Sequence, residues 1–282
     1  MVDQSTVERL KDLACEARKN ILRLCHKGAT HIGGDLSMAD MMTVLYQYGM
    51  KYDPKRPDWE ERDRFILSKG HGAGCLYVTL AMAGYFSMDE VLAKYREPGS
   101  PFGEHPSSEV PGVEISTGSL GHGLSVSVGL ALAARLDGRG NRVFTLMGDG
   151  ETQEGSVWEA AMAAAHYELG NLVAFVDRNR ISLDGETEKL LRLEPYAEKW
   201  RAFGWNVVVI DGHDIEQIVA VFDNLPPVDS KKPTVVIGKT VKGKGVASME
   251  NDVNWHAGSI DADFLARSCA ELDEARRRER GE

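Results

Sequence analysis

The segment Met147 to Gly155, M-G-D-G-E-T-Q-E-G, holds three glycines and three carboxylates in nine positions. It follows the apolar run R-V-F-T-L-M, which is typical of a buried strand. Glycines in such a turn let the backbone approach a bound phosphate closely, but nearby carboxylates would repel the phosphate. A divalent cation bound between carboxylate and phosphate would remove this conflict. The segment therefore predicts a site for a metal ion and a phosphate.

A second polar turn, V-D-R-N-R-I-S, follows the next apolar run, L-V-A-F-V-D. Asp149 and Asn179 would then follow two strands joined by one crossover helix, and such strands are neighbours or nearly so. A carboxylate, an amide and a main-chain carbonyl would converge there, and these oxygens suit Mg²⁺ or Ca²⁺. The plainer alternative is that Asp149 caps a helix and Asn179 lies in a turn. The paired placement favours the metal site.

Four of the eight histidines lie in glycine- or proline-rich turns, or in polar stretches without apolar periodicity. They are His31 in T-H-I-G-G, His71 in S-K-G-H-G, His105 in F-G-E-H-P and His256 in V-N-W-H-A-G. Imidazoles titrate near neutral pH and suit proton transfer to and from hydroxyl groups. We predict that these four form part of an active site.

The other four histidines have simpler interpretations. His26 is near the end of the first expected helix, His166 is late in a later helix, and His213 lies in a turn beside a helix start. His122, in G-H-G, is a weaker candidate for a ligand contact.

The elements that must position these residues follow from hydrophobic patterning. From Arg142 onward, short apolar strands alternate with helices, which predicts an α/β fold with a doubly wound, mostly parallel sheet and helices on both faces. Ligands of such sheets bind beyond the carboxyl ends of the strands. The expected strands are 142–147, 172–177, 206–210 and 233–238, and the expected helices are 154–168, 195–203, 214–224 and one at the C-terminus.

The first half of the chain is less regular. A helix is expected from Ser5 to Lys27, with Gly28 ending it. A second helix is expected to start at Ser37, where Ser37 and Asp40 resemble a capping box. A strand should follow at 64–68, and Ser87 should cap a short helix.

Composition narrows the class of protein. The 282 residues carry a formal net charge of −10, which argues against nucleic-acid or anionic-membrane partners. The four cysteines are scattered, so free thiols in a reducing compartment are expected. No signal pattern and no long apolar run is present in the sequence, so we expect a cytoplasmic protein.

Five motifs in register resemble those of transketolases, which use thiamine diphosphate. The resemblance covers nearly the whole chain. The motifs are T-H-I-G-G-D-L-S-M-A-D (30–40), R-D-R-F-I-L-S-K-G-H-G (62–72), P-G-V-E-I-S-T-G-S-L-G-H-G-L-S (111–125), G-D-G-E-T-Q-E-G-S-V-W-E-A (148–160) and V-D-R-N-R-I-S-L-D-G (176–185).

The resemblance implies a role for each matched residue near the cofactor. Asp149 and Asn179 would hold Mg²⁺, with Ca²⁺ or Mn²⁺ as alternatives, through their side chains, and Ile181 would do so through its carbonyl oxygen. Gly150 would pack beside the diphosphate. A further three would line the cofactor cleft or face the partner's activating glutamate: Gly118, Leu120 and Glu154.

The resemblance also implies roles for the histidines. His31 and His256 would contact the donor hydroxyls around the bond that breaks. His71 and His105 would lie near the reacting carbonyl and the cofactor. The reaction would move a two-carbon ketol unit from a ketose, expected to be phosphorylated, to an aldose, as part of carbohydrate metabolism.

The matched region is one domain. Full transketolases continue into a pyrimidine-binding domain and a C-terminal domain, so residues 1–282 resemble the N-terminal subunit of a split transketolase with a single diphosphate-binding domain. A second chain would bring the pyrimidine-binding domain and the activating glutamate, giving an α₂β₂ heterotetramer. We expect negligible activity without it.

Alternatives within thiamine chemistry are a deoxyxylulose-phosphate synthase-like or a 2-oxoacid dehydrogenase-like subunit, or a transketolase for a branched or sulfonated sugar. A nicotinamide dehydrogenase fits poorly, because G-S-L-G-H-G at 118–123 has the wrong glycine spacing. A protein that only binds the cofactor would not need the four histidines.

Overall fold

The structure, a computed structural model, describes residues 3–282. Its centre is a five-stranded sheet in the order β1-β2-β3-β5-β4, with every neighbouring pair parallel. The strands are β1 (Arg64–Leu67), β2 (Val143–Gly148), β3 (Leu172–Arg178), β4 (Asn206–Asp211) and β5 (Thr234–Lys239). The predicted α/β fold class is confirmed.

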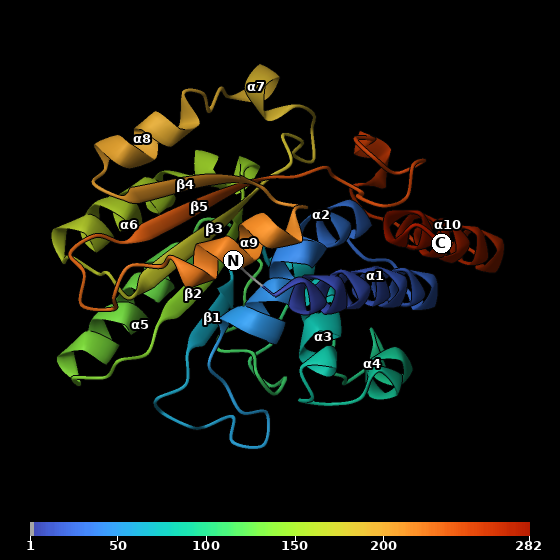
Figure 1. Cartoon of the computed structure of the whole chain (residues 1–282), viewed down its shortest axis with the longest axis horizontal. Coiled ribbons are helices and arrows are strands. Elements are labelled where there is room, and N and C mark those ends of the chain that lie inside the picture. Colours follow the sequence, from blue (N-terminus) through green and yellow to red (C-terminus); the bar gives the residue numbers. More distant parts are fainter. Residues whose placement is uncertain (1–2) are drawn as a thin grey trace.

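Helices cover both faces of the sheet (Figure 1). The longer ones are α1 (Gln4–Lys27), α2 (Ile32–Val44), α3 (Ala73–Met82), α5 (Gly123–Leu136), α6 (Gly155–His166), α9 (Ile215–Asp223) and α10 (Ala262–Arg280). The shorter ones are α4 (Met88–Lys94), α7 (Thr187–Leu190) and α8 (Tyr196–Ala202). Every helix among residues 3–282 is too short or too polar to cross a bilayer.

Alternate residues of the strands pack into two separate cores, because successive side chains of a strand point to opposite faces. On β3, Val173 and Phe175 belong to the core under α1, α2, α3 and α9. Leu172, Ala174 and Val176 belong to the core under α5, α6 and α8. The strands are thus covered on both faces, which explains their continuous apolar runs.

The predicted start of the second helix at Ser37 is wrong. Helix α2 begins at Ile32, and Ser37 lies inside it, where its hydroxyl donates to the Gly34 carbonyl at 3.1 Å and to Asp177 Oδ2 at 2.5 Å. The glycines at 33 and 34 suggested a loop. Burial overrides that preference, because a Cβ at Gly33 would come within 2.6 Å of the Trp255 carbonyl oxygen.

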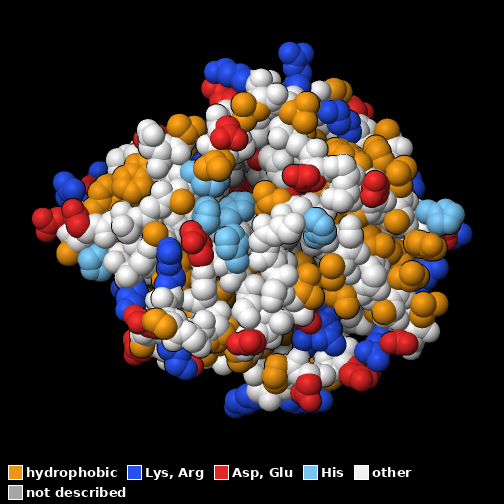
Figure 2. Space-filling model, turned by 180° about the vertical axis from the view of Figure 1, so that it is seen from behind, with side chains coloured by type: hydrophobic (Ala, Val, Ile, Leu, Met, Phe, Trp, Pro, Cys, Tyr) orange, Lys and Arg blue, Asp and Glu red, His pale blue; other side chains and the backbone are white. Residues whose placement is uncertain are grey.

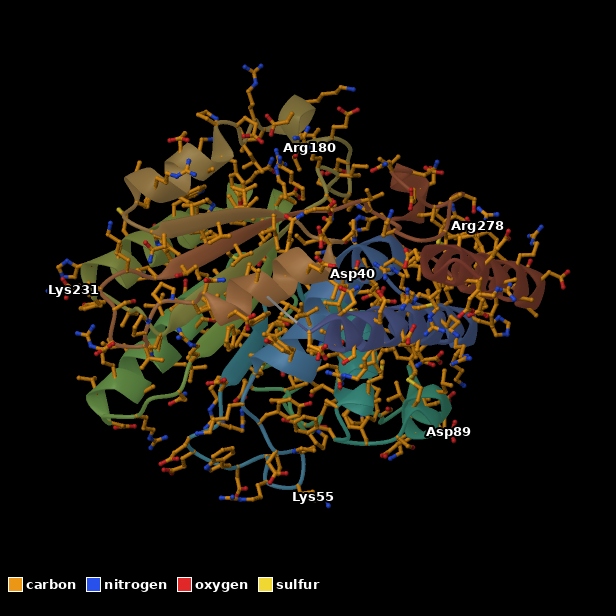
Figure 3. All side chains as sticks on the ribbon, in the orientation of Figure 1. Asp40, Lys55, Asp89, Arg180, Lys231 and Arg278 are labelled. Atoms are coloured by element: carbon orange, nitrogen blue, oxygen red, sulfur yellow. The ribbon has the colours of Figure 1, made fainter. Side chains whose placement is uncertain are left out.

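Other local expectations are confirmed. The Ser87 hydroxyl accepts from the amide of Glu90 at 3.1 Å and caps α4. All four cysteines are free thiols. Charged side chains project outward over most of the molecule, among them Lys55 and Asp89, whereas Asp40 lies in the interior on α2 (Figure 3).

Candidate active site

A cleft of about 520 Å³ lies at the carboxyl ends of β1, β2, β3 and β5. Ten of the eleven residues selected from the sequence line it. They are His31, His71, His105, Gly118, Leu120, Asp149, Gly150, Asn179, Ile181 and His256. The exception is Glu154, which is exposed at the N-terminus of α6.

The four histidines come from four separate segments and meet in this cleft. His31 directly precedes α2, and His71 lies in the short turn after β1. The His31 ring centroid lies 5.4 Å from those of His71 and His256 and 5.9 Å from that of His105. Figure 2 shows histidine side chains gathered at a hollow of the surface.

The cleft lowers the basicity of three of these imidazoles. Burial lowers the pKa of His31, and it lowers the pKa of His71 well below its ordinary value. Burial, together with the positive charge of Lys242, lowers the pKa of His256 to about 4. These rings are therefore neutral at neutral pH and can exchange hydrogen bonds with hydroxyl groups.

Asp149 and Asn179 lie side by side because β2 and β3 are hydrogen-bonded neighbours. The Asp149 carboxylate accepts from Arg178 Nη1 at 2.9 Å and from the amides of Gly150 at 2.7 Å and Arg180 at 2.6 Å. Burial raises the pKa of Asp149, although Arg178 opposes the effect. The side-chain oxygen of Asn179 accepts from the Ile181 amide at 3.0 Å.

These oxygens form a hard donor set rather than a cluster of ionisable ligands. Within the described part of the chain, no three His, Cys, Asp or Glu side chains are arranged to hold a metal ion. The candidate set consists of one carboxylate, one amide and one carbonyl, which suits Mg²⁺ when a phosphate and water complete the coordination.

Two buried lysines at the cleft were missed from the sequence. Lys69, 1% exposed, donates to Asp177 Oδ2 at 2.7 Å and to the Gly34 carbonyl at 2.9 Å. Lys242, 2% exposed, donates to the Ile181 carbonyl at 3.1 Å and lies 2.7 Å from His256 Nδ1. Burial lowers the pKa of Lys242 to about 8, and Lys69 adds to this.

The only hint in the sequence was that both lysines lie in glycine-rich turns, S-K-G-H-G and V-K-G-K-G. Glycine-flanked lysines are common at surfaces, so this hint is weak. A buried cation at a cleft is informative because its charge must be matched by an anion. Lys69 has Asp177 as its partner, and Lys242 contacts only carbonyl oxygens and an imidazole.

The remaining histidines lie outside the cleft. His122 is exposed, and its Nδ1 lies 2.9 Å from the Leu120 carbonyl oxygen. His26 Nδ1 lies 2.9 Å from the carbonyl of Ile260. His213 precedes the α9 cap as expected, but both of its ring nitrogens have partners.

Comparison with protein families matches residues 3–273 to the thiamine diphosphate-binding domain of transketolase. A subunit of the apulose-4-phosphate transketolase of Phocaeicola vulgatus is 44% identical over 269 residues, which cover 95% of each chain. The 6-deoxy-6-sulfo-D-fructose transketolase subunit SqwG of a Clostridium species is 41% identical, over 87% of this chain and 89% of that protein.

Solved structures agree with these matches. The transketolase of Campylobacter jejuni superposes with a TM-score of 0.87 at 29% identity, over 96% of this chain. The chain spans 43% of that protein's length. It likewise spans 41% of human transketolase-like protein 2, to which it is 40% identical.

Proposed function

Since the chain belongs to the transketolase family, as its thiamine diphosphate-binding domain, we propose that it works as one subunit of a transketolase. The reaction moves a two-carbon ketol unit from a ketose to an aldose. One observation carries the proposal. The four imidazoles share a single cleft with the oxygens of Asp149 and Asn179. A protein that merely bound a diphosphate would need the oxygens but not the imidazoles.

The residues of the cleft fit the cofactor and a divalent ion. Asp149, Asn179 and the Ile181 carbonyl would hold Mg²⁺, with Ca²⁺ or Mn²⁺ as alternatives. Lys242 is buried without a carboxylate in hydrogen-bond contact, so an anionic diphosphate would supply the missing charge. A Cβ at Gly150 would come within 3.2 Å of the Ser182 Cβ, so the backbone is already tightly packed there.

Two ligand assignments have a local consequence. The Ile181 carbonyl accepts from Lys242 Nζ, so metal binding requires this oxygen to share its second lone pair. The Asp149 carboxylate accepts three hydrogen bonds and keeps further lone pairs for a metal. Arg178 and the two amides hold this carboxylate in place, so little rearrangement is needed.

When bound, thiamine diphosphate supplies the nucleophilic carbon and the electron sink that allow a carbon–carbon bond beside a carbonyl to break. The protein's own part is to orient the substrate and move protons. His256 accepts from the Lys242 ammonium at Nδ1 and is neutral, so its hydrogen lies on Nε2. That N–H can donate to a hydroxyl oxygen of the sugar.

His31, His71 and His105 surround the same space and complete the contacts. With His31 and His71 neutral, each can accept a hydroxyl hydrogen at one ring nitrogen. We assign His31 and His256 to the donor hydroxyls and His71 and His105 to the region of the carbonyl and cofactor. Gly118 and Leu120 line the cleft beside His105.

The activity requires a second chain. The two apulose-4-phosphate relatives, each named as a transketolase subunit, match this chain over 87 to 95% of their own length. This supports a division of the enzyme between two polypeptides. We propose that a companion subunit with the pyrimidine-binding domain and the activating glutamate completes the site in an α₂β₂ assembly. Glu154, exposed beside the cleft, would face it. A cytoplasmic location follows from the proposed metabolic role.

The substrate pair is narrower than the reaction class. One relative is named for apulose-4-phosphate, a branched sugar phosphate, and another for a sulfonated fructose. These names support a dedicated sugar-degrading transketolase as the alternative to one of central metabolism. A panel of phosphorylated, branched and sulfonated ketoses, assayed with the reconstituted pair, would separate the two.

Exchange of Asp149 for Asn tests the cofactor site. Asp149→Asn keeps the shape of the side chain but removes the charge that would face the metal. We expect the affinity for thiamine diphosphate with Mg²⁺, measured by titration calorimetry, to fall at least a hundredfold. Asp184→Asn, which changes an exposed carboxylate of the same cleft, is the matched control and should bind normally.

Thermal unfolding must accompany this measurement, because Asp149 neutralises the buried Arg178 and its loss costs stability. The comparison is made well below the melting temperature of Asp149→Asn. Unchanged affinity in this variant would refute the metal assignment.

A further inference from the structure

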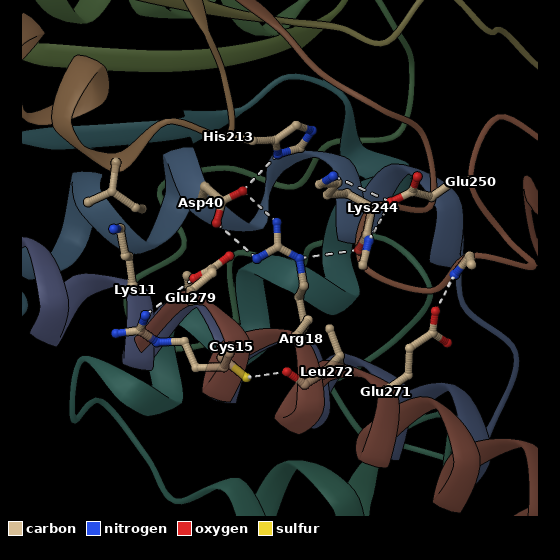
Figure 4. A pocket seen from close by; sticks show the side chains of 16 residues that line it. Lys11, Cys15, Arg18, Asp40, His213, Lys244, Glu250, Glu271, Leu272 and Glu279 are labelled. Atoms are coloured by element: carbon tan, nitrogen blue, oxygen red, sulfur yellow. Dashed lines mark hydrogen bonds and ion pairs between the residues drawn. The ribbon is translucent and has the colours of Figure 1, made fainter. Parts of the chain in front are cut away.

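Outside the cleft, a buried ion pair links two helices to a turn (Figure 4). Both guanidinium nitrogens of Arg18, on α1, donate to the two carboxylate oxygens of Asp40, on α2. His213, in the turn between β4 and α9, lies with its Nδ1 2.7 Å from Asp40 Oδ2. These side chains border a separate cavity of about 330 Å³. None of them touches the proposed cofactor site.

The second ring nitrogen of His213 has a different partner. Its Nε2 accepts from the backbone amide of Val241 at 2.8 Å. A backbone amide can only donate, and an ionised carboxylate can only accept. The imidazole must therefore carry its hydrogen on Nδ1 and a lone pair on Nε2. Burial would raise the pKa of Asp40, but Arg18 and His213 hold it below its ordinary value, so the carboxylate is ionised.

Val241 immediately precedes Lys242, the buried lysine of the cleft. The neighbouring residues of this segment are anchored on the cleft side. The Thr240 hydroxyl donates to Asp177, Lys242 Nζ to the Ile181 carbonyl, and the Gly243 amide to the Gly33 carbonyl. The Val241 amide is anchored on the opposite side, by His213. The segment is thus held between the cleft and the ion pair.

A role for His213 in shaping its own turn does not explain the imidazole. The turn is held by backbone donors, since the His213 amide donates to Asp211 Oδ1 at 2.9 Å. Asp214 caps α9 by accepting from the amides of Glu216 and Gln217. Those bonds remain when the ring is removed, whereas the Val241 amide loses its partner.

We propose that His213 is a positioning residue for the reaction centre. Arg18 and Asp40 fix its tautomer, and its Nε2 holds the Val241 amide so that the Lys242 ammonium stays directed into the cleft. The importance of this link rests on the proposed function, in which Lys242 meets the diphosphate. The link itself is a property of the chain without cofactor and can be tested in that form.

The test measures how accessible the Lys242 amine is in the absence of cofactor. The chain is treated briefly with a water-soluble acetylating reagent, and acetylation of each lysine is followed by mass spectrometry. Lys69, equally buried but held by Asp177, is the internal reference. We expect His213→Ala to raise the rate at Lys242 at least fivefold while the rate at Lys69 stays constant.

Two further variants separate positioning from general loosening. The side-chain oxygen of Gln can accept the Val241 hydrogen bond, so His213→Gln should keep the Lys242 rate within twofold of the wild type. His166→Ala, which removes an imidazole at the end of α6, should match the wild type. An unchanged Lys242 rate in His213→Ala, an equal rise at Lys69, or a failure of Gln to protect would overturn the proposal.

A measurement on the wild type covers the case in which His213→Ala does not fold. Nitrogen-15 spectra of the imidazoles should show His213 as the Nδ1–H tautomer alone, and the Val241 amide should exchange slowly with deuterium. A mixture of tautomers or a fast-exchanging Val241 amide would overturn the link. Loss of transketolase activity or of cofactor binding affects neither readout, so the two proposals fail separately.

Discussion

His31 differs from the other imidazoles of the cleft in having a carboxylate close by. Its Nδ1 is buried without a hydrogen-bond partner and lies 3.7 Å from Glu104 Oε1. Glu104 is also 3.7 Å from Arg96 through its other oxygen. The groups that face His31 from other segments are neutral or positive: His71, His105, His256, Lys69 and Lys242. Glu104 therefore provides the one opposing influence on its charge.

Exchange of Glu104 for Gln tests this influence. Burial lowers the pKa of His31, and the negative charge of Glu104 partly offsets it by stabilising the imidazolium. Without that charge the pKa should fall further, so the His31 proton is released at a lower pH. An NMR titration of the ring measures the midpoint.

Glu97→Gln is the control, since Glu97 loses the same charge nearby but pairs with Lys27 at 2.7 Å. An unmoved or raised His31 midpoint in Glu104→Gln would show that the carboxylate does not act on the ring.

At the scale of elements, helix α2 is the most deeply placed, and all thirteen of its residues are buried. It carries Asp35, whose Oδ1 accepts from the Cys75 amide at 2.9 Å. Its Oδ2 has no partner and packs against Gly74, where a Cβ would come within 2.6 Å of it. Burial raises the pKa of this carboxyl to about 7. The position of the helix thus makes one of its side chains costly to ionise.

Asp35→Asn should therefore stabilise the protein in a pH-dependent way. The folded-state pKa is above the unfolded value, so the folded protein binds the extra proton between about pH 4 and 7. Wild-type stability falls as the pH rises through that window and levels off above it. A difference of about three pKa units corresponds to at most ~4 kcal/mol. The variant's advantage should grow over the same window.

Urea unfolding at a series of pH values measures this advantage. Asp89→Asn on α4, an exposed position, is the control and should show no such slope (Figure 3). An Asp35→Asn advantage that is the same at pH 4.5 and pH 8 would contradict the raised pKa.

The elements differ in how well the sequence predicted them. From Val143 onward the strands and helices fall within a few residues of expectation, because strands covered on both faces are continuous apolar runs between turns. The region before it was harder. Helix α2 contains two glycines and no amphipathic stripe, since it is buried on every side, and its start was misplaced. The strand order, with β5 between β3 and β4, follows from tertiary packing alone.

The candidate site was predicted in part for a similar reason. Histidines and carboxylates in glycine-rich turns are conspicuous by type, and parallel strands bring such turns to one edge. Lys69 and Lys242 escaped notice because only their burial distinguishes them from surface lysines. The contacts of Arg178 with Asp149 and of His213 with Val241 join segments distant in the sequence, and no local pattern marks them.

At the scale of the whole molecule, the cleft opens beside an unusual patch of exposed leucines. Leu183, Leu190 and Leu191 line its mouth and are 65%, 50% and 58% exposed. Their segment is attached to the site, because the Leu191 carbonyl accepts from Gln153 at 2.7 Å and Arg178 contacts Glu188 and Glu194. Exposed apolar side chains at the mouth of a binding site favour a partner that covers them. This supports the proposed companion subunit.

Exchange of Leu191 for Asp should block that association without unfolding the chain. The side chain is exposed, and its backbone bond to Gln153 does not depend on it, so thermal stability should stay within about 0.5 kcal/mol of the wild type. A charge placed in the centre of an apolar contact would weaken binding of the companion at least a hundredfold. Analytical ultracentrifugation measures the assembly, and a two-carbon transfer assay measures its activity.

The lone chain gives the baseline for this experiment, since with thiamine diphosphate and Mg²⁺ it should show less than about 1% of the rate of the pair. Leu136→Asp is the matched control. Leu136 is 78% exposed at the end of α5, which precedes β2 and so lies at the edge of the sheet away from the cleft. This variant should assemble and turn over normally. Full activity of the lone chain would show that the cleft needs no second polypeptide. Normal assembly of Leu191→Asp would show that the companion covers a different face.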